Sequence, residues 1–505
     1  MNIDLIMVTA GSQGEQDRKH LPLGLLYVGS ILKAEGFDVR IYHILPSEFG
    51  LAKAEIIKRN PLWIGLSVLS GTTTYHAAVY SKELKKALPG TPVVWGGHHP
   101  SNTAQQCLEQ GYVDIAVKGE GEITALELSR KLSDKKPLDG VKGISFKKDG
   151  RVIHNENREL IQDLDSLPLD YSLLDMDYYI GKKERRNVSF FGSRGCPFNC
   201  AFCSTPKFTG KVYRFHSKDY ILGHLQPLKE KYGLNSVYFS DDNFFVNKER
   251  AYSILCDMHE KGIYCHTFDV RLNQLEEEDC AKLNELNTRG IFFGWESGCD
   301  RLLKLIRKGF NTEYILKKAE MLRKFKNLRF WGSGIMLLPT ETLEETRQTI
   351  AFSCRLRKLL PNSTIGLFRF MCLPGTDLTG TAVSEGFVLP SGPEGWRVID
   401  PMSSDYSAPW VKWMTEELDK KVRYVQEYSR SGIMNYINNK NILEKSVKNW
   451  LAGSMNKRCA SLDFSFLFEP ALYNMALKTY NVLLGRDYQM LGTEILRSGK
   501  VRRKE

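Results

Sequence analysis

The chain has 505 residues, and 70 lysines and arginines against 59 aspartates and glutamates give it a formal net charge of +11 at pH 7. A chain of this length exceeds one compact core, so we expect two or three domains. Its hydrophobic content of 42% is ordinary for a globular protein. The mild positive charge is compatible with an anionic substrate, but it does not indicate a nucleic-acid partner.

The eleven cysteines do not form the paired framework of a secreted protein. The first residues, Met1-Asn2-Ile3-Asp4, run directly into an apolar segment without the basic region and cleavage site of a signal peptide. No stretch approaches the length of a membrane span without charged residues. We therefore expect a cytoplasmic protein in a reducing compartment, with no transmembrane segment.

Short apolar runs and helical periodicity alternate over the first 135 residues. The apolar runs predict strands at 4–9, 38–42, 63–68, 92–95 and 113–117, and the periodicity predicts helices at 24–35 and 75–88. Strands that alternate with helices at this spacing form βαβ units. Residues 1–135 are therefore predicted to be an α/β domain with a doubly wound, Rossmann-like parallel sheet.

Small or hydroxyl-bearing residues follow three of these strands, at the edge where such sheets bind ligands. They are Ser67, Ser70 and Thr73 after the third strand, Gly96, Gly97, His98 and His99 after the fourth, and Gly119, Glu120 and Gly121 after the fifth. Each loop alone can be an ordinary turn, because such turns need glycine anyway. Three loops at one edge favour a binding site, since small residues let backbone amides approach a ligand closely.

Residues 136–186 are expected to be a linker with a packing surface. Within this range, residues 143–146 and 151–154 flank the turn Asp149-Gly150, a pattern typical of a β-hairpin. The alternation of strands and helices resumes only after this linker.

The second domain is predicted at residues 187–380. Its strands are expected at 187–192, 236–240, 265–270, 291–295, 330–338 and 364–370, with helices at 247–261, 276–287, 312–324 and 343–359. Six strands interleaved with helices suit a partial (β/α)6 barrel of the TIM type, whose catalytic groups gather at the strand carboxyl ends. Residues 381–505 are expected to form a mainly helical cap over the substrate region, with a helix at 414–431.

The first strand of this domain leads into residues 195–204, G-C-P-F-N-C-A-F-C-S, where Cys196, Cys200 and Cys203 have the spacing C-x3-C-x2-C. Thiolates are the soft ligands of iron–sulfur clusters. Three of them leave one iron of a [4Fe–4S] cluster without a protein ligand, and an open position is what a catalytic metal centre needs. A structural zinc site is the alternative, but it needs four ligands and the next cysteine is Cys256.

Polar residues collect at the later strand ends of the same domain: Asp241, Asp242, Arg271, Glu296, Ser297 and Ser333. Serine and asparagine are also favoured helix caps, so a structural role for Ser297 and Asn243 stays open. The three acidic residues together favour a functional role.

The cysteine motif, with the aromatic Phe202 before its third cysteine, resembles the signature C-x3-C-x-aromatic-C of the radical S-adenosylmethionine (SAM) enzymes. F-S-D-D-N-F and G-W-E-S-G resemble SAM-binding positions of that family, and the resemblance covers residues 187–380. It implies that SAM chelates the fourth iron and is cleaved by one electron to a 5′-deoxyadenosyl radical. The fifth strand departs from the family, because it ends in L-P-T-E-T where many members have G-L-P-G-E.

This resemblance assigns expected SAM contacts to the strand-end residues. Asp241 or Asp242 is expected at the SAM ammonium, Arg271 at its carboxylate, Glu296 and Ser297 at its ribose, Phe202 at its adenine, and Ser333 as a further SAM contact.

The segments L-P-L-G-L-L-Y, G-G-H-H-P and K-G-E-G-E resemble the cobalamin-binding domain that is fused to many radical SAM enzymes, over residues 1–135. The residues of the three loops after strands three to five are then expected cobalamin contacts. The motif D-x-H-x-x-G, which brings a histidine to cobalt, is absent. The resemblance therefore implies cobalamin with its own base displaced and no histidine as lower ligand, with His98 and His99 along the corrin edge or the nucleotide tail.

Both cofactor domains together imply a cobalamin-dependent radical SAM methyltransferase. It would transfer a methyl group from methylcobalamin to an unactivated carbon, or a phosphinate phosphorus, of a small-molecule substrate, with an electron donor such as flavodoxin or ferredoxin as partner. A cyclase or rearrangement enzyme that keeps both cofactors is an open alternative. A redox sensor with an iron–sulfur cluster and a corrinoid is disfavoured because it has no need of SAM-binding residues. A tRNA-modifying enzyme is disfavoured because Cys107 is the only cysteine before Cys196.

Overall fold

The computed structural model describes residues 1–10, 20–180, 186–431, 433–435 and 442–464. These residues form two compact units. The first unit consists of Met1–Asp269 with Met371–Ala408, and the second of Val270–Phe370 with the described residues from Pro409 onward.

The N-terminal part of the first unit contains a seven-stranded sheet in the order β2-β1-β3-β4-β5-β6-β7. The strands are β1 (Asn2–Val8), β2 (Asp38–Ile44), β3 (Trp63–Ser67), β4 (Val93–Gly96), β5 (Ile115–Val117), β6 (Ile144–Lys148) and β7 (Arg151–His154). β1 pairs in parallel with β2 and β3, so that Ile3 lies opposite both Val39 and Trp63. The pairs β3–β4 and β4–β5 are also parallel, whereas β6 and β7 join in antiparallel orientation.

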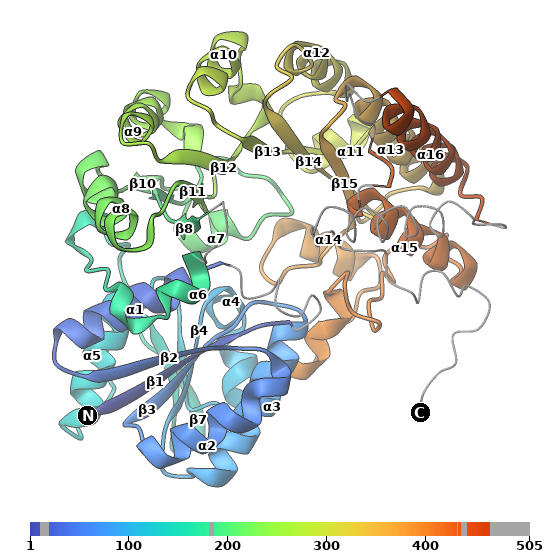
Figure 1. Ribbon diagram of the computed structural model, residues 1–505. Coiled ribbons are helices and arrows are strands. Elements are labelled where there is room, and N and C mark those ends of the chain that lie inside the picture. Colours follow the sequence, from blue (N-terminus) through green and yellow to red (C-terminus); the bar gives the residue numbers. More distant parts are fainter. Residues whose placement is uncertain (11–19, 181–185, 432, 436–441, 465–505) are drawn as a thin grey trace. The chain divides into compact units, whose positions relative to one another are not determined.

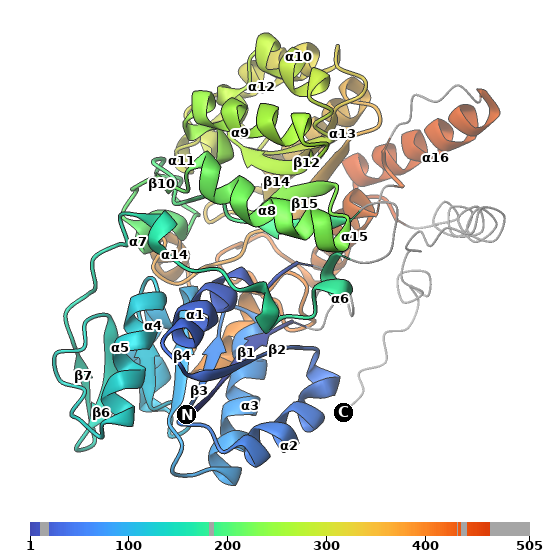
Figure 2. The same ribbon diagram turned by 60° about the vertical axis from the view of Figure 1, so that its left-hand side comes forward.

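Helices cover both faces of this sheet (Figures 1 and 2). They are α1 (Leu23–Ala34), α2 (Phe49–Arg59), α3 (Thr72–Ala87), α4 (His98–Glu109) and α5 (Glu122–Ser133), with the short η2 (Pro46–Glu48) before α2. α2, α3 and α4 share one core with strand residues such as Ile64, and α1 and α5 share the other with residues such as Leu5. Burial on both faces explains why the strands read as continuous apolar runs. The predicted doubly wound α/β fold is confirmed.

The range predicted as a linker contributes to this sheet. The predicted hairpin is present as β6 and β7, and it extends the sheet past residue 135 to His154. The short η3 (Leu164–Ser166), η4 (Tyr171–Leu173) and α6 (Met176–Ile180) follow it.

The remainder of the first unit begins with parallel strands. β11 (Ser236–Phe239) pairs in parallel with β8 (Asn187–Phe190) and with β12 (Tyr264–Val270). β9 (Ser193–Arg194) and β10 (Arg214–Phe215) form a short antiparallel ladder. The other elements are α7 (Thr205–Thr209), α8 (Lys218–Tyr232), η5 (Phe244–Val246), α9 (Lys248–Glu260), α14 (Asp377–Ser384) and η7 (Pro393–Ile399).

Residues 371–408 return to the N-terminal sheet domain. The segment with η7 lies against α3 in both views (orange in Figures 1 and 2). Asp400 accepts a hydrogen bond from the backbone N–H of Thr72 at 3.2 Å, and the indole N–H of Trp396 donates to Gln106 at 2.6 Å. These contacts tie the segment to the start of α3 and to α4.

The second unit contains β13 (Gly290–Glu296), β14 (Arg329–Met336) and β15 (Thr364–Arg369), which pair in parallel in this order. Its helices are η6 (Leu272–Gln274), α10 (Glu277–Glu285), α11 (Asp300–Leu305), α12 (Thr312–Leu322), α13 (Leu343–Leu359), α15 (Glu416–Arg430) and α16 (Ile442–Ser461). Every strand and helix predicted between residues 187 and 370 is present, and so is the helix predicted at 414–431. The last 41 residues of the predicted cap, 465–505, lie outside the described residues. Among the described helices, every one is too short or too polar to cross a bilayer.

Candidate active site

The three cysteines of the C-x3-C-x2-C motif lie in one loop of the first unit, between β9 and α7; we call residues 195–204 the cluster loop. Cys196, Cys200 and Cys203 are each partly exposed, and none forms a disulfide. The backbone N–H of Cys203 donates to the carbonyl oxygen of Cys200 at 3.1 Å, which closes a turn between the second and third cysteine. The three cysteines are therefore not part of the fully buried core.

Hydrogen-bond donors surround two of these thiols. The hydroxyl and N–H of Thr205 donate to the sulfur of Cys203, and the N–H of Phe198 donates to that of Cys196, while burial raises the pKa of both thiols. Such donors suit sulfurs that carry the negative charge of an iron–sulfur cluster. In the part of the chain that the structure describes, no three His, Cys, Asp or Glu side chains converge as on a single ion. The cysteines of a [4Fe–4S] cluster each bind a different iron, so they need not converge on a single point.

Gly195 allows the chain to turn from β9 into the cluster loop. Its φ of +87° lies in the left-handed region that favours glycine. A Cβ atom at this position would lie 2.0 Å from the carbonyl oxygen of Val212, which precedes β10 by two residues. The backbone at Val212 therefore packs directly against the start of the cluster loop.

Asp242, which follows β11, ties together both ends of the cluster loop. Its carboxylate accepts a hydrogen bond from the N–H of Gly195 at 2.9 Å and another from the hydroxyl of Thr205 at 2.8 Å. One residue thus fixes the entry to the loop and the helix that follows it. The assignment of Asp242 to the SAM ammonium stays a prediction, and the structure adds this positioning role to it.

Asp241 and Asp269 lie at the carboxyl ends of neighbouring parallel strands. Asp241 accepts from the N–H of Gly192 at 2.7 Å, and burial raises its pKa to about 6. Asp269 accepts a hydrogen bond from the hydroxyl of Tyr238; burial, and then the charges of Asp241 and Asp242, raise its pKa to about 7. Asp269 was not among the predicted site residues, because its place at the end of β12 was the only signal for it. The sheet edge thus carries three carboxylates.

A cavity of about 450 Å³ in the first unit lies next to the cluster loop. Seven of the predicted cobalamin contacts line this cavity: Ser67, Gly96, Gly97, His98, Gly119, Glu120 and Gly121. Residues near the cluster loop line it as well, among them Arg194, Gly195, Thr205 and Asp242. Apolar side chains of the sheet, such as Leu5, Trp63 and Val94, also line it. We call the glycine-rich loops the rim and the apolar side chains the apolar slot; together they suit a cofactor with apolar and polar parts, and the volume falls within the roughly 300–1,000 Å³ typical of ligand pockets.

Gly97 lets the loop after β4 pack closely against the loop after β3. Its φ is +103°, and a Cβ atom would lie 2.9 Å from the carbonyl oxygen of Val68. The N–H of His99 donates to the same oxygen at 3.2 Å. This close approach holds two of the three predicted binding loops in one rim.

The two adjacent histidines have different environments. His98 lines the cavity and stacks on Phe208 of α7, with ring centroids 4.3 Å apart. His99 is fully buried, its Nδ1 lies 3.0 Å from the hydroxyl oxygen of Ser70, and burial lowers its pKa to about 3, so the ring is neutral. Three of the predicted cobalamin contacts do not line the cavity, namely Ser70, Thr73 and His99.

Glu120 and Glu122 of K-G-E-G-E pair with two arginines beside the cluster loop. Arg194 of β9 lies 2.9 Å from Glu120 and 2.6 Å from Glu122, and Arg214 of β10 lies 2.8 Å from Glu120. None of the four side chains is more than 14% exposed. Burial alone would raise the pKa of Glu120, but the two arginines hold it below its ordinary value. The arginines were not predicted, because 74 and 94 residues separate them from Glu120.

In the second unit, Glu296 is part of a buried ionic cluster. The ammonium of Lys308 lies 2.7 Å from its carboxylate, with both side chains at most 7% exposed, and Arg271 donates to the carbonyl oxygen of Lys308. The φ of Glu296 is +61°, a strained value for a residue other than glycine, and such strain concentrates at functional sites. Lys308 was not predicted, since its loop carries no motif. The SAM contacts assigned to Glu296 and Arg271 stay predictions.

The remaining predicted SAM contacts lie in different surroundings. Ser297 is buried, and its oxygen lies 3.1 Å from that of Thr349 and accepts from the N–H of Cys299 at 3.1 Å. Ser333 is partly buried in β14, and Phe202 is partly exposed in the cluster loop. Ser297 therefore has the bonding of a structural residue, and its contact with SAM stays a prediction.

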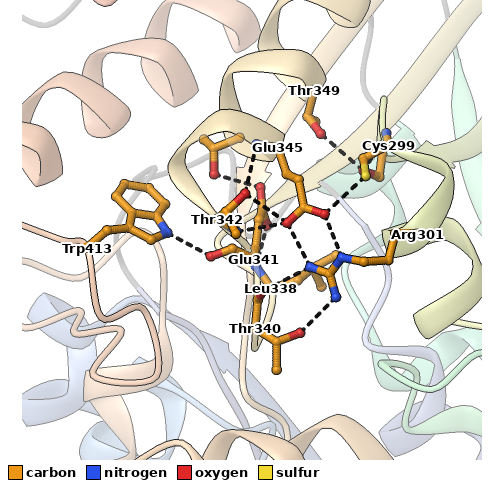
Figure 3. A network of polar contacts seen from close by, with 11 residues as sticks. Cys299, Arg301, Leu338, Thr340, Glu341, Thr342, Glu345, Thr349 and Trp413 are labelled. Atoms are coloured by element: carbon orange, nitrogen blue, oxygen red, sulfur yellow. Dashed lines mark hydrogen bonds and ion pairs between the residues drawn. The ribbon is translucent and has the colours of Figure 1, made fainter.

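A polar network fixes the turn L-P-T-E-T after β14 (Figure 3). The guanidinium of Arg301 donates twice to Glu345, at 2.6 and 2.7 Å, and holds the pKa of that carboxyl at about 2. Glu341 is buried and accepts from the N–H of Leu338 at 2.7 Å, while the indole of Trp413 donates to the Glu341 carbonyl at 2.7 Å. The turn is thus held from α11, from α13 and from the segment before α15.

Replacing Glu341 with glutamine is expected to stabilise the protein at pH 8 and to have little effect at pH 5. Burial raises the pKa of Glu341 from its usual 4.5 to about 7. Between these values the unfolded chain releases a proton that the folded protein keeps, so the free energy of unfolding falls as pH rises, by about 3 kcal/mol in total. The glutamine amide keeps the geometry without the charge. The measurement is denaturant unfolding of both proteins at the two pH values.

Glu345→Gln is the matched control, because its expected effect on the free energy of unfolding at pH 8 has the opposite sign. Arg301 holds the pKa of Glu345 low, so the carboxylate stabilises the fold above the ordinary pKa and glutamine should destabilise it at pH 8. If the free energy of unfolding depends on pH equally in the wild type and in Glu341→Gln, the raised pKa of the buried Glu341 carboxyl is contradicted.

Comparison with known proteins gives two family matches, the radical SAM superfamily over residues 191–353 and the B12 binding domain over residues 15–129. An uncharacterised methyltransferase of Pyrococcus horikoshii is 33% identical over 427 residues, which cover 82% of this chain and 89% of that protein. An anaerobic magnesium-protoporphyrin IX monomethyl ester cyclase of Synechocystis is 29% identical over 60% of this chain and 62% of that protein. The structure of the radical SAM methyltransferase TsrM from Kitasatospora setae, with cobalamin and a [4Fe–4S] cluster bound, aligns with a TM-score of 0.63 and 17% identity, covering 79% of this chain and 84% of that one.

Proposed function

Since the chain belongs to the radical SAM superfamily and carries a B12-binding domain, we propose that it is a cobalamin-dependent radical SAM methyltransferase acting on an unactivated carbon or phosphorus of a small molecule. The observation that carries the proposal is the shared cavity, in which the G-G-H-H-P and K-G-E-G-E loops line one space together with Gly195, the first residue of the cluster loop. A radical formed at the cluster and a methyl donor held by the loops need such a common space, because the reacting groups must meet.

The residues of the chain divide the work of binding between them. Cys196, Cys200 and Cys203 hold the cluster, while Asp242 fixes the ends of their loop. The glycine-rich rim and His98 hold cobalamin over the apolar slot. When bound, the two cofactors and SAM supply the radical and the methyl group, and the protein supplies position and an environment closed to water.

We further propose a flavodoxin- or ferredoxin-type electron donor and a cytoplasmic location. The superfamily needs an external electron, and the eleven cysteines, all free of disulfides, suit a reducing compartment. A cyclase that keeps both cofactors is the second candidate function. The relative in Synechocystis supports it, but over a smaller share of the chain than the methyltransferase from Pyrococcus horikoshii.

The test is product analysis by mass spectrometry after anaerobic incubation of reconstituted protein with SAM, methylcobalamin, reductant and a host-cell extract. We expect both 5′-deoxyadenosine and S-adenosylhomocysteine, formed only with the extract, and a product heavier than its substrate by one CH2 unit, because a methyl group replaces a hydrogen. Deoxyadenosine without S-adenosylhomocysteine would favour the cyclase. Formation of neither product by protein with a full cluster would reject both and favour a sensor.

A further inference from the structure

The helix α7 connects the cluster loop with the cavity that carries the predicted cobalamin contacts. It begins directly after the cluster loop, and its residues Thr205, Phe208 and Thr209 all line the cavity. At the start of the helix, the hydroxyl and the N–H of Thr205 donate to the sulfur of Cys203. One short helix is therefore in contact with the cavity and with the third cysteine of the motif.

His98 of the G-G-H-H-P loop lies against this helix. Its ring stacks on the ring of Phe208, with the centroids 4.3 Å apart and an angle of 11° between the planes. Its Nδ1 atom lies 3.4 Å from the hydroxyl oxygen of Ser204, the last residue of the cluster loop. Because His98 also lines the cavity, one side chain contacts both the cavity and the end of the cluster loop.

Backbone hydrogen bonds fix Phe208 to the cluster loop. Its N–H donates to the carbonyl oxygen of Ser204 at 3.1 Å, and the N–H of Lys207 donates to the same oxygen at 3.0 Å. Since Ser204 follows Cys203 directly, a shift of the Cys203 backbone displaces the Phe208 ring as well. A displaced ring loses its stacking contact with His98, because such contacts require close and nearly parallel planes. The path from the cavity to a cluster ligand thus runs through His98 and Phe208.

We propose that the stack of His98 on Phe208 couples the two cofactor sites, so that an assembled iron–sulfur cluster raises the affinity of the cavity for cobalamin. This inference rests on the proposed function for the presence of both cofactors. A bound cluster fixes Cys203 and with it α7, so Phe208 is already held against His98 when the corrinoid binds. The corrinoid then has fewer groups to order, and it binds more tightly. By linkage, the bound corrinoid stabilises the cluster by the same factor.

The test measures the dissociation constant of hydroxocobalamin by absorbance titration of the full chain, once with a reconstituted cluster and once without it. In the wild type we expect the cluster to lower this constant about 5-fold or more, as is typical of coupled sites. In Phe208→Leu, which stays apolar but lacks the ring, the ratio of the two constants is expected to fall to about 1. His98→Ala should lose the ratio in the same way, whereas His98→Phe keeps a ring that can stack and should keep most of the ratio.

Phe37→Leu is the matched control for Phe208→Leu. Phe37 is also a partly buried phenylalanine of the first unit, but it packs against the core of the N-terminal sheet and does not line the cavity. This variant should keep the wild-type ratio. Iron content and circular dichroism establish that each compared protein is folded and carries its cluster. If Phe208→Leu holds no cluster, the two His98 variants, which leave α7 unchanged, supply the same comparison.

The outcomes distinguish the coupling from the proposed function. If the wild type binds no hydroxocobalamin or assembles no cluster, the proposed function is wrong, and the coupling fails with it. If the wild type binds both but the cluster leaves the dissociation constant unchanged, the coupling is overturned while the proposed function stands. The same holds if Phe208→Leu and His98→Ala keep the wild-type ratio. A ratio that is lost equally in His98→Phe and His98→Ala would overturn the role of the stack.

Discussion

Replacement of Cys200 with alanine is expected to lower the affinity of the protein for the iron–sulfur cluster by at least about 100-fold and to abolish SAM cleavage. A change in the groups that merely support metal ligands already costs about 10–100-fold, and Cys200 is one of only three thiols in the motif. The remaining two thiolates cannot hold three of the four irons. Iron and sulfide content, together with 5′-deoxyadenosine after incubation with SAM and dithionite, measure the effect.

Cys256→Ala is the control for this substitution. Cys256 is also a partly exposed cysteine of the first unit, without a disulfide and without neighbouring cysteines in ligand spacing. It should keep full iron content and full deoxyadenosine formation. Deoxyadenosine formation that persists in Cys200→Ala would overturn the assignment of the cluster to this loop.

Alanine at Gly195 is expected to remove the cluster although all three thiols remain. The φ of +87° costs an alanine about 1–2 kcal/mol. The larger effect is the collision of the new Cβ with the Val212 carbonyl oxygen at 2.0 Å, because a backbone atom cannot rotate away. Relief requires the loop or the β10 strand to shift, and this moves Cys196 relative to the other thiols. Iron content and the free energy of unfolding are the two measurements.

The Gly210→Ala variant distinguishes the effect of the positive φ from that of the steric collision. Gly210 has a similar φ of +63°, but a Cβ there would meet no atom within 4 Å. This variant should lose about 1 kcal/mol of stability and keep its iron. If both variants keep their iron, the packing of Val212 against Gly195 has no part in shaping the cluster loop.

The elements of the fold could be predicted because their signals are local. Buried parallel strands read as apolar runs, and helices as periodic segments, so β3 at Trp63–Ser67 and α13 at Leu343–Leu359 were both found from a few neighbouring residues. The hairpin at β6 and β7 was predicted as well. That it extends the N-terminal sheet was not, because pairing with β5 depends on residues far along the chain.

The residues of the candidate site were predictable where the residue type has a single characteristic chemical role. Three cysteines in ten residues indicate a metal centre wherever they occur. Carboxylates were harder, because the same residue type binds a ligand, caps a loop or pairs with an arginine. Asp242 bonds to both ends of the cluster loop, and Lys308 neutralises Glu296, although neither partner is close in sequence. Such pairings arise from the fold, and a single sequence does not contain them.

Because Glu120 and Glu122 form ion pairs with Arg194, the cobalamin-binding domain and the cluster loop cannot be exchanged independently of each other. Arg194 stands two residues before Cys196, while its partners belong to the domain that carries cobalamin. Loss of either side of a buried pair leaves an uncompensated charge, at a cost of about 3–5 kcal/mol. A corrinoid domain grafted from a relative will therefore support the cluster loop only if it brings both glutamates in register.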